Sequence, residues 1–447
     1  MALSGLDIYK LLPKTNCKKC GSPTCLAFAM KLAMKKTSLD QCPDISEEAK
    51  ASLAQASRPP IATITIGSGD NKVETGGETV LFRHEKTFYH QTAIAISVED
   101  TLSDSELTEK VKSIEGLSFE RVGQHIEIDM IALVNTSASS EKFINTLDKL
   151  VAASGKPIIL ISDNVKAIED ALKKYPDKKP LIYAATSANL KDMSRIAKSY
   201  KAPLALKADG LEELDKLSQE AASSGIEELV LDPNPSTLNQ AINDFTQIRR
   251  LCLKKNYRAF GYPIIAFVKS KEKYQMVQEA STFIAKYASL IVIDSLDKEV
   301  LLPVVTLRQN IYTDPQKPVT VEPKLYAFGA VDKNSPVMVT TNFSLTFYTV
   351  SPEIEASKNP AYLLVTDSEG MSVLTAWAAE KFTPEGISES MKKFDVESAV
   401  SHKKIIIPGY VSVLSGKLED ASGWQVLVGP KEASGLPKYL KEVWTKS

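Results

Sequence analysis

Three features are scarce in this chain, and each scarcity excludes a class of function. The longest apolar runs, such as "PIILI" and "LIVI", are strand-sized, whereas a membrane span needs about 18 residues. An excess of charge of one sign is also missing: the chain has 54 basic and 55 acidic residues, for a formal net charge of −1. The chain has only four histidines, and His84, His90 and His125 are not grouped as ligands. We therefore expect no membrane span, no nucleic-acid partner and no histidine-based metal site.

Phosphate-binding and secretory signals are also missing. No Gly-x-Gly-x-x-Gly follows a predicted strand and no Walker-type loop is present, so nucleotide binding is not indicated. The opening stretch "MALSGLDIYKLLPK" has no apolar core long enough for a signal peptide. We expect a cytoplasmic location, where disulfides are disfavoured.

Cysteine is present in an unusual distribution. Four of the five cysteines, Cys17, Cys20, Cys25 and Cys42, lie in the first tenth of the chain, separated by two, four and sixteen residues. The two-residue spacing of the first pair lets both thiolates bind the same metal cluster, which is typical of a metal-cluster site. We interpret the motif as an iron–sulfur site. Structural zinc and ordinary core cysteines stay open as alternatives, although zinc ribbons usually present two short knuckles. Cys252 is expected to be a buried thiol.

Proline-rich stretches divide the chain into three segments. Residues 1–60 end at Arg58-Pro59-Pro60, where two prolines stop any helix. In residues 61–312, "IATITI" and "TVLF" predict an antiparallel lead-in, after which eight β-branched strands alternate with helical runs, the pattern of a TIM barrel. Residues 313–447 open with Pro315, Pro318 and Pro323 and predict a small α/β sandwich. Both proline stretches are candidate hinges.

Polar side chains follow the predicted barrel strands, where barrel enzymes place their chemistry. They are Asp163, Asn164, Ser187, Asn189, Lys207, Asp209, Asp232, Asn234 and Asp294. Asp, Asn and Ser are also the ordinary caps of helices that begin there. Because no carboxylate pair or Cys/His constellation stands out, we assign no catalytic residue.

The last segment predicts a ligand site at one edge of its sheet. Its strands end in Thr340-Thr341-Asn342, Thr366-Asp367-Ser368, Pro408-Gly409 and Gly429-Pro430. Ligands of parallel sheets bind outside these carboxyl ends. The loops "DSEGMSVLTAW" and "VGPKEASGLP" are rich in small residues, which favours a large, flat ligand, while simple tight turns are the alternative.

Several motifs together resemble a known family. "NCKKCGSPTCLAFAMKLA", "GYPIIA", "VTTNFSLTFYTV" and "IIIPGYVSVLSGKLEDASGWQVLVGPKEASGLP" are similar to the large (gamma) subunit of the corrinoid iron–sulfur protein of the reductive acetyl-CoA (Wood–Ljungdahl) pathway. The resemblance covers essentially the whole chain. It implies an α/β protein with an N-terminal iron–sulfur domain (1–60), a central TIM (β/α)8 barrel (61–312) and a C-terminal Rossmann-like corrinoid-binding domain (313–447).

The resemblance also implies a function as a methyl carrier. The Co(I) corrinoid would accept a methyl group from methyltetrahydrofolate through a separate methyltransferase and deliver it to acetyl-CoA synthase. The cluster would serve the reductive reactivation of Co(II). The implied partners are a small barrel subunit in a heterodimer, that methyltransferase, the synthase and a reductive activator protein.

Site residues follow from the same resemblance. The implied 4Fe-4S ligands are Cys17, Cys20, Cys25 and Cys42. Corrinoid contacts are expected from small or polar residues of the edge loops: Thr340, Thr346, Gly370, Met371, Ser372, Val373 and Ala433. The Asp-x-His-x-x-Gly motif of many corrinoid methyltransferases is missing, and His402 is predicted at the opposite end of a strand. We therefore expect no protein ligand on the lower cobalt face.

Two other functions stay open at this point. The chain could be an iron–sulfur electron-transfer subunit without corrinoid, or its barrel could itself be a pterin-dependent methyltransferase. The sequence does not give the lower base of the corrinoid, the cluster potential or the docking surfaces of the partners.

Overall fold

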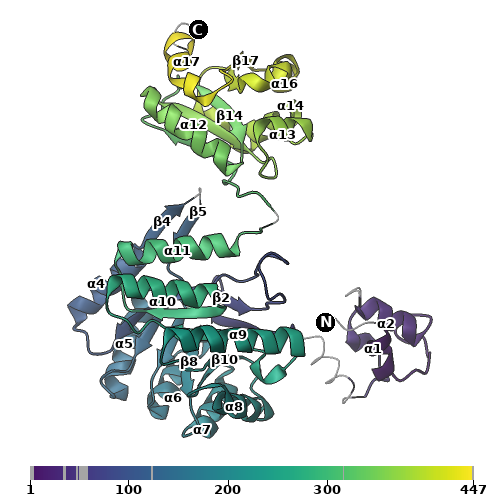
Figure 1. Ribbon diagram of the computed structural model, residues 1–447, viewed down its shortest axis with the longest axis vertical. Helices are drawn as coiled ribbons and strands as arrows, with labels where there is room; N and C mark the ends of the chain where they lie inside the picture. Colours follow the sequence, from purple (N-terminus) through teal and green to yellow (C-terminus); the bar gives the residue numbers. More distant parts are fainter. Residues whose placement is uncertain are drawn as a thin grey trace. The chain divides into compact units, whose positions relative to one another are not determined.

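The computed structural model describes residues 5–33, 37–46, 49, 59–121, 124–315 and 317–444 (Figure 1). The chain forms two compact units: Met1–Leu81, Tyr89–Val111 and Asp129–Ser295 make up the first, and Phe82–Phe88, Lys112–Ile128 and Leu296–Ser447 the second. The predicted division into three domains at residues 60 and 312 stays a prediction. Arg58, part of one predicted hinge, lies outside the described residues. None of the described helices is both long and apolar enough to cross a membrane.

The N-terminal segment is a small helical body built around the cysteines. Helix α1 (Gly5–Leu11), helix α2 (Cys25–Ala33) and the 3-10 turn η1 (Leu39–Gln41) surround a core that includes Ile8, Leu12 and Phe28. The loop between α1 and α2 has left-handed backbone at several residues, including Gly21 with φ 70°. This loop carries Cys17 and Cys20.

A hairpin precedes the barrel and differs from the predicted lead-in. Strand β1 (Thr63–Ser68) pairs with β2 (Asn71–Gly76), not with the predicted "TVLF" strand at residues 79–82. The carbonyl of Val80 instead accepts a hydrogen bond from Arg249 Nε at 3.1 Å, and that of Leu81 accepts one from Tyr287 Oη at 3.1 Å. Because these backbone groups bind side chains, the segment is not a strand. The sequence analysis missed β2, the strand that pairs with β1, because most of its residues are polar.

The TIM barrel is confirmed. Eight parallel strands of the described chain close a barrel, in spatial order β3 (Ala93–Glu99), β6 (Met130–Val134), β7 (Ile158–Ile161), β8 (Leu181–Ala185), β9 (Leu204–Lys207), β10 (Leu229–Asp232), β11 (Ile264–Phe267) and β12 (Ala288–Ile293). The connecting helices are α4 (Asp104–Glu115), α5 (Ser140–Ala153), α6 (Val165–Lys174), α7 (Leu190–Tyr200), α8 (Leu211–Ser223), α9 (Leu238–Lys255) and α10 (Lys273–Ala285), with 3-10 turns η2 (Pro176–Lys178) and η3 (Arg258–Phe260). Ile64 and Ile66 of β1 join the apolar barrel core.

The second unit contains a hairpin, a helix and a five-stranded domain. Strands β4 (Ser118–Arg121) and β5 (Gln124–Glu127) pair antiparallel, and Arg121 and Gln124 bind Gln309 of helix α11 (Lys298–Tyr312). The sheet that follows has the order β13 (Leu325–Phe328), β15 (Ala361–Thr366), β14 (Val337–Thr341), β16 (Lys404–Ile407) and β17 (Gln425–Val428). All pairs in it are parallel except that of β13, an edge strand the sequence analysis missed.

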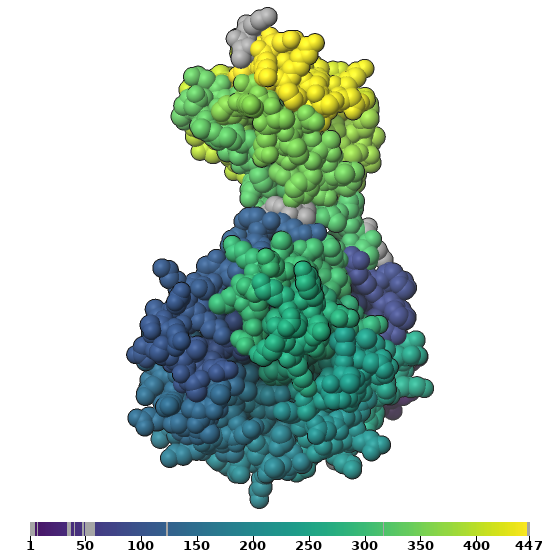
Figure 2. All heavy atoms as spheres, turned by 60° about the vertical axis from the view of Figure 1, so that its left-hand side comes forward, coloured from purple at the N-terminus to yellow at the C-terminus, as the bar shows by residue number. Residues whose placement is uncertain are grey.

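Helices cover both faces of this sheet. Helices α12 (Ser344–Ser357) and α17 (Leu436–Glu442) pack on one face. Helices α13 (Val373–Ala378), α14 (Pro384–Lys393), α15 (Val396–Ala399) and α16 (Ser415–Ser422) pack on the other, and 3-10 turns η4 (Gly409–Leu414) and η5 (Ala433–Gly435) lie in the loops. Figure 2 shows one face of this sheet and its helices as closely packed atoms, coloured green to yellow. The three-layer α/β arrangement confirms the predicted Rossmann-like class.

Candidate cluster and corrinoid sites

Three of the four cysteines share one small core in the N-terminal segment: Cys25 and Cys42 belong to it, and Cys20 packs against it. Cys25 and Cys42 are buried, and Cys17 and Cys20 are half-buried. The backbone N–H of Asn16 donates to Cys25 Sγ at 3.3 Å, and Asn16 Oδ1 accepts from the backbone N–H of Cys25 at 2.8 Å. This reciprocal pair fixes the loop against the start of α2.

The other three cysteines affect the ionisation of Cys42. Burial raises the pKa of Cys42, and the neighbouring Cys20, Cys17 and Cys25 raise that pKa further through their charge. Lys19 Nζ lies 3.2 Å from Asp44 Oδ1, and this contact is the main reason why the pKa of Asp44 is lowered. The pair ties the loop of Cys17 and Cys20 to the segment after Cys42.

The donor set fits an iron–sulfur cluster. A cluster held by four cysteines spreads its thiolates around a wider body than one ion does. Four cysteine thiols, three around the loop before α2 and one after η1, are the donor set that such a cluster requires.

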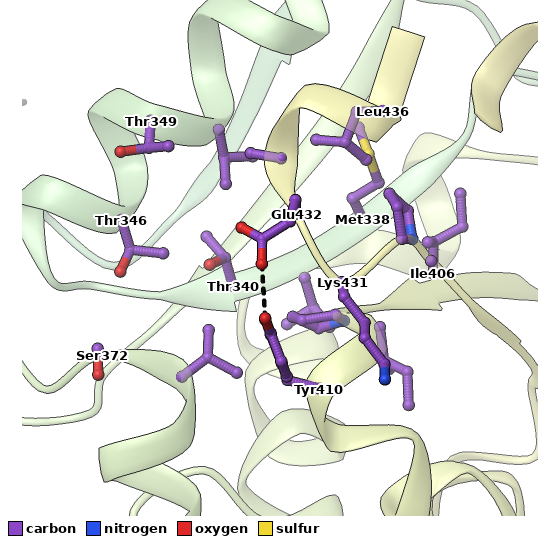
Figure 3. A pocket seen from close by; sticks show the side chains of 18 of the residues that line it. Met338, Thr340, Thr346, Thr349, Ser372, Ile406, Tyr410, Lys431, Glu432 and Leu436 are labelled. Atoms are coloured by element: carbon purple, nitrogen blue, oxygen red, sulfur yellow. Dashed lines mark hydrogen bonds between the residues drawn. The ribbon is translucent and has the colours of Figure 1, made fainter. Parts of the chain in front are cut away.

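A cavity opens at the predicted ligand edge of the C-terminal sheet (Figure 3). It has a volume of about 370 Å³ and is formed by the carboxyl ends of β14, β16 and β17 with parts of α12, α13 and α17. Five of the predicted contact residues line it: Thr340, Thr346, Ser372, Val373 and Ala433. The structure thus gathers residues from four separate loops and helices around one space.

Two predicted residues do not line this cavity. Gly370 lies behind the wall, where an added Cβ would stand 2.8 Å from Thr320 Cγ2 and 3.1 Å from Pro318 Cβ. Its φ is +74°, so the position favours glycine for backbone reasons. Met371 packs against the apolar core beneath α13 and α14.

The cavity wall is mainly apolar, with one unpaired hydroxyl. Met338, Ile406 and Leu436 supply apolar surface. Thr340 is only 2% exposed, and its Oγ1 has no hydrogen-bond partner. A buried unpaired polar group costs about 1–3 kcal/mol, which a ligand that bonds to the hydroxyl would recover. The orphan hydroxyl is therefore evidence for a polar group on the occupant.

Large apolar side chains stand half exposed around the opening. Leu345, Leu374 and Tyr410 line the cavity, yet they remain 66%, 45% and 45% exposed. Tyr410 Oη donates to Glu432 Oε1 at 2.5 Å, and this hydrogen bond raises the pKa of Tyr410 (Figure 3). A broad ligand lying over the opening would bury this apolar surface.

Several lining residues were missed by sequence reasoning. Leu345 and Thr349 lie one helical turn apart on α12, and Tyr410, Lys431 and Glu432 lie in the loops after β16 and β17. The spacing of four residues on α12 was a usable signal. The exposure of Tyr410 had no signature in the sequence, because an isolated aromatic residue usually indicates core.

His402 lies away from the cavity, as predicted. It precedes β16, its Nε2 contacts the carbonyl of Ser335 at 2.9 Å, and its ring packs edge-on against Trp444. Among the described residues that line the cavity there is no histidine.

The polar barrel residues take mainly structural positions. Asn164 caps α6 by accepting from the N–H groups of Lys166 and Ala167. Asp232 differs: it is 2% exposed, accepts a hydrogen bond from Tyr183 Oη at 2.6 Å, and has its pKa raised by burial. Its hydrogen-bond partners, Tyr183 and the backbone N–H of Asn234, both belong to the barrel.

Comparisons with known proteins match both the cysteine segment and the rest of the chain. The family model for the CO dehydrogenase/acetyl-CoA synthase delta subunit matches residues 63–440, and a model for an Fe-S cluster segment matches residues 12–43. A dihydropteroate synthase structure from Thermus thermophilus is similar over 54% of this chain and 98% of its own, with 14% identity and a TM-score of 0.39.

Curated relatives cover the whole chain. The corrinoid/iron-sulfur protein large subunit of Moorella thermoacetica is 51% identical over 441 residues, 99% of each chain. The acetyl-CoA decarbonylase/synthase complex subunit gamma of Methanothermobacter thermautotrophicus is 39% identical over 456 residues, again 99% of each chain. The chain therefore belongs to the family of corrinoid/iron-sulfur protein large subunits and acetyl-CoA decarbonylase/synthase gamma subunits.

Proposed function

We propose that this protein is a methyl carrier of the acetyl-CoA pathway that holds a corrinoid and a 4Fe-4S cluster. A corrinoid supplies a cobalt centre that accepts and donates methyl groups, and a cluster supplies low-potential electrons; side chains supply neither. The observation that carries the proposal is the cavity at the carboxyl edge of the C-terminal sheet, with its unpaired Thr340 hydroxyl. Relatives named for both cofactors support it.

The cavity and its rim would hold different parts of the cofactor. A volume of about 370 Å³ suits a projecting arm of a corrinoid better than a whole macrocycle with its amide side chains. The ring itself would rest on the half-exposed side chains of Leu345, Leu374 and Tyr410. Thr340 would hydrogen bond to the arm, and Ser372 and Thr346 would offer further hydroxyls.

The described residues that line the cavity include no imidazole for the metal. Because His402 is bound to Ser335 and the described lining contains no histidine, the lower face of the cobalt would have no imidazole from this chain. An axial nitrogen ligand stabilises the higher oxidation states, so its absence favours the reduced, nucleophilic metal.

The four cysteines would hold the cluster that restores the reduced cofactor. Cys25 and Cys42 would ligate from the buried side, and the half-buried Cys17 and Cys20 from the side nearer solvent. That asymmetry leaves one side of the cluster open for electron exchange with a donor protein.

The chain would act within an assembly. The name "large subunit" of the Moorella relative implies a small subunit, and we propose a heterodimer with it. Methyltetrahydrofolate methyltransferase, acetyl-CoA synthase and a reductive activator protein would visit the cofactor in turn.

Metal analysis of the complex tests the proposal. The chain is purified without oxygen together with its small subunit, and cobalt, iron and acid-labile sulfide are measured along with the visible spectrum. We expect cobalt in a corrinoid and iron with sulfide in the same protein. If the complex contained iron and sulfide but no cobalt, even after incubation with corrinoid, the protein would be an electron-transfer subunit and not a methyl carrier.

A further inference from the structure

Asn342 stands at the centre of a hydrogen-bond cluster behind the cavity wall. It follows strand β14 and is 4% exposed. Its Oδ1 accepts three hydrogen bonds, from the backbone N–H of Ser368 at 2.9 Å, from Ser368 Oγ at 2.8 Å and from the backbone N–H of Gly370 at 3.0 Å. Its Nδ2 donates to Asp367 Oδ1 at 3.0 Å. One side chain thus holds three positions of the loop between β15 and α13.

The same loop leads directly into the cavity wall. Ser372, Val373 and Leu374, which line the cavity, begin two residues after Gly370. Ser368 Oγ also contacts the carbonyl of Met371 at 3.1 Å, which extends the fixed stretch to the residue before Ser372. The position of that wall therefore depends on the position of residues 367–371.

The backbone of Asn342 is bound to the segment that precedes strand β13. The backbone N–H of Val321 donates to the carbonyl of Asn342 at 2.8 Å, and the N–H of Ser344 donates to the carbonyl of Val319 at 3.0 Å. Thr320 also touches the loop, because it lies where a side chain at Gly370 would be. The stretch Pro318–Val321, the end of β14 and the loop are thus joined through one residue.

We propose that Asn342 is a positioning residue for the cofactor: it does not line the cavity but holds the loop of residues 367–371, so that Ser372, Val373 and Leu374 form the wall. The inference rests on the proposed corrinoid function. Asn342 also joins the stretch Pro318–Val321 to the same loop.

Three variants separate the bonds that Asn342 makes. Asn342→Ala removes all four. Asn342→Asp keeps an acceptor for Ser368 and Gly370 but loses the donor and sets a carboxylate against Asp367. The double variant Asn342→Asp with Asp367→Asn provides a donor on the other side and restores the bond between the two side chains, although the N–H of Glu369 loses the Oδ1 acceptor that it has in the parent. Asp367→Asn alone keeps an acceptor for Asn342 and is the matched control.

Two measurements are made on the full chain with its small subunit. Hydrogen exchange of the Ser368 and Gly370 amides, without corrinoid, reports on the loop itself, and titration with cobalamin gives the affinity. We expect faster exchange and an affinity lower by roughly tenfold or more in Asn342→Ala and Asn342→Asp, with recovery in the double variant and near-parent values in Asp367→Asn.

The outcomes distinguish the role of Asn342 from the proposed corrinoid function on which it rests. If the parent binds cobalamin and the two Asn342 variants bind it equally well, Asn342 does not position the site. If the parent binds none, the proposed function fails, while faster exchange in the variants would still report the loop contact. If Asn342→Ala does not fold, Gly370→Ala serves instead, because it disturbs the loop from the side of Thr320 and should also lower the affinity for cobalamin. If Gly370→Ala and Asn342→Asp both bind cobalamin as tightly as the parent does, the proposal is wrong.

Discussion

Replacing Thr340 by valine is expected to stabilise the cofactor-free protein and to weaken its binding of corrinoid. The side chain is 2% exposed and its hydroxyl has no partner, so the free protein bears the cost of a dehydrated, unbonded oxygen. Valine keeps the branched shape and removes the oxygen. When the ligand is bound, the hydroxyl of threonine is satisfied, and valine then loses that bond.

The size of both effects follows from one hydrogen bond. Removing an unpaired buried hydroxyl should raise the free energy of unfolding by about 1 kcal/mol. Losing its bond to the ligand should cost about 1–2 kcal/mol of binding, which is roughly a five- to thirtyfold weaker affinity. The two changes have opposite consequences, so a general loosening of the domain cannot imitate them.

The neighbouring residue offers a matched control. Thr341 is fully buried and its Oγ1 is likewise unpaired, but it does not line the cavity. Thr341→Val should stabilise the free protein in the same way and leave the affinity for corrinoid unchanged.

Tryptophan fluorescence provides the assay for both quantities. The three tryptophans of the chain, Trp377, Trp424 and Trp444, all lie in the C-terminal domain, so denaturant unfolding followed by their emission reports on this domain. Quenching of the same emission by added cobalamin gives the affinity. Equal affinities for Thr340→Val, Thr341→Val and the parent would refute the placement of the ligand against Thr340.

Further predictions concern the cluster, the cavity and the barrel. Cys20→Ala or Cys42→Ala removes one of four thiolates, so iron content should fall and reductive activation of the cofactor should fail while cobalt is retained; normal reactivation by a low-potential donor protein would contradict the cluster's role. Ala433→Phe fills the cavity, and cobalt should be lost with iron intact; equal cobalt in variant and parent would exclude the site. Burial raises the pKa of Asp232, so its contribution to barrel stability is present below the unfolded pKa, about 3.9, and is lost as pH rises through the folded value. The melting temperature of Asp232→Asn relative to the parent, measured by calorimetry, should therefore increase as pH rises from about 4; a constant difference would show that Asp232 ionises normally.

The barrel could be predicted because its strands are apolar on both faces. Continuous runs such as Ile158–Ile161 and Leu229–Asp232 leave little ambiguity, since only a strand covered on both sides buries every residue. Strand β2 was missed because most of it is polar, and β13 was missed because it is a partly exposed edge strand. Pattern reasoning therefore succeeded where burial is uniform and failed at exposed edges.

The cysteine spacing predicted an iron–sulfur site, and the match of residues 12–43 to an Fe-S cluster family supports that site, while the four individual ligands stay a prediction. A short loop forces Cys17, Cys20 and Cys25 to be neighbours. The cavity was predictable only in part. Thr340, at a strand end, lines the cavity, whereas Gly370 and Met371 do not, because no sequence rule says which side of a loop faces a cavity. Their contacts with a corrinoid stay a prediction. Tyr410 was missed because its contact with Glu432 joins two loops distant in sequence.

The most direct test of the central claim follows a labelled methyl group. The complex with its small subunit, loaded with corrinoid and reduced, is mixed with carbon-14 methyl-labelled methyltetrahydrofolate and the methyltransferase, and the label bound to the complex is compared with its cobalt content. We predict about one methyl group per cobalt, lost when acetyl-CoA synthase with carbon monoxide and coenzyme A is added, and no labelling without the methyltransferase. A complex with full cobalt that takes up no label, or label bound without cobalt, would contradict a methyl carrier.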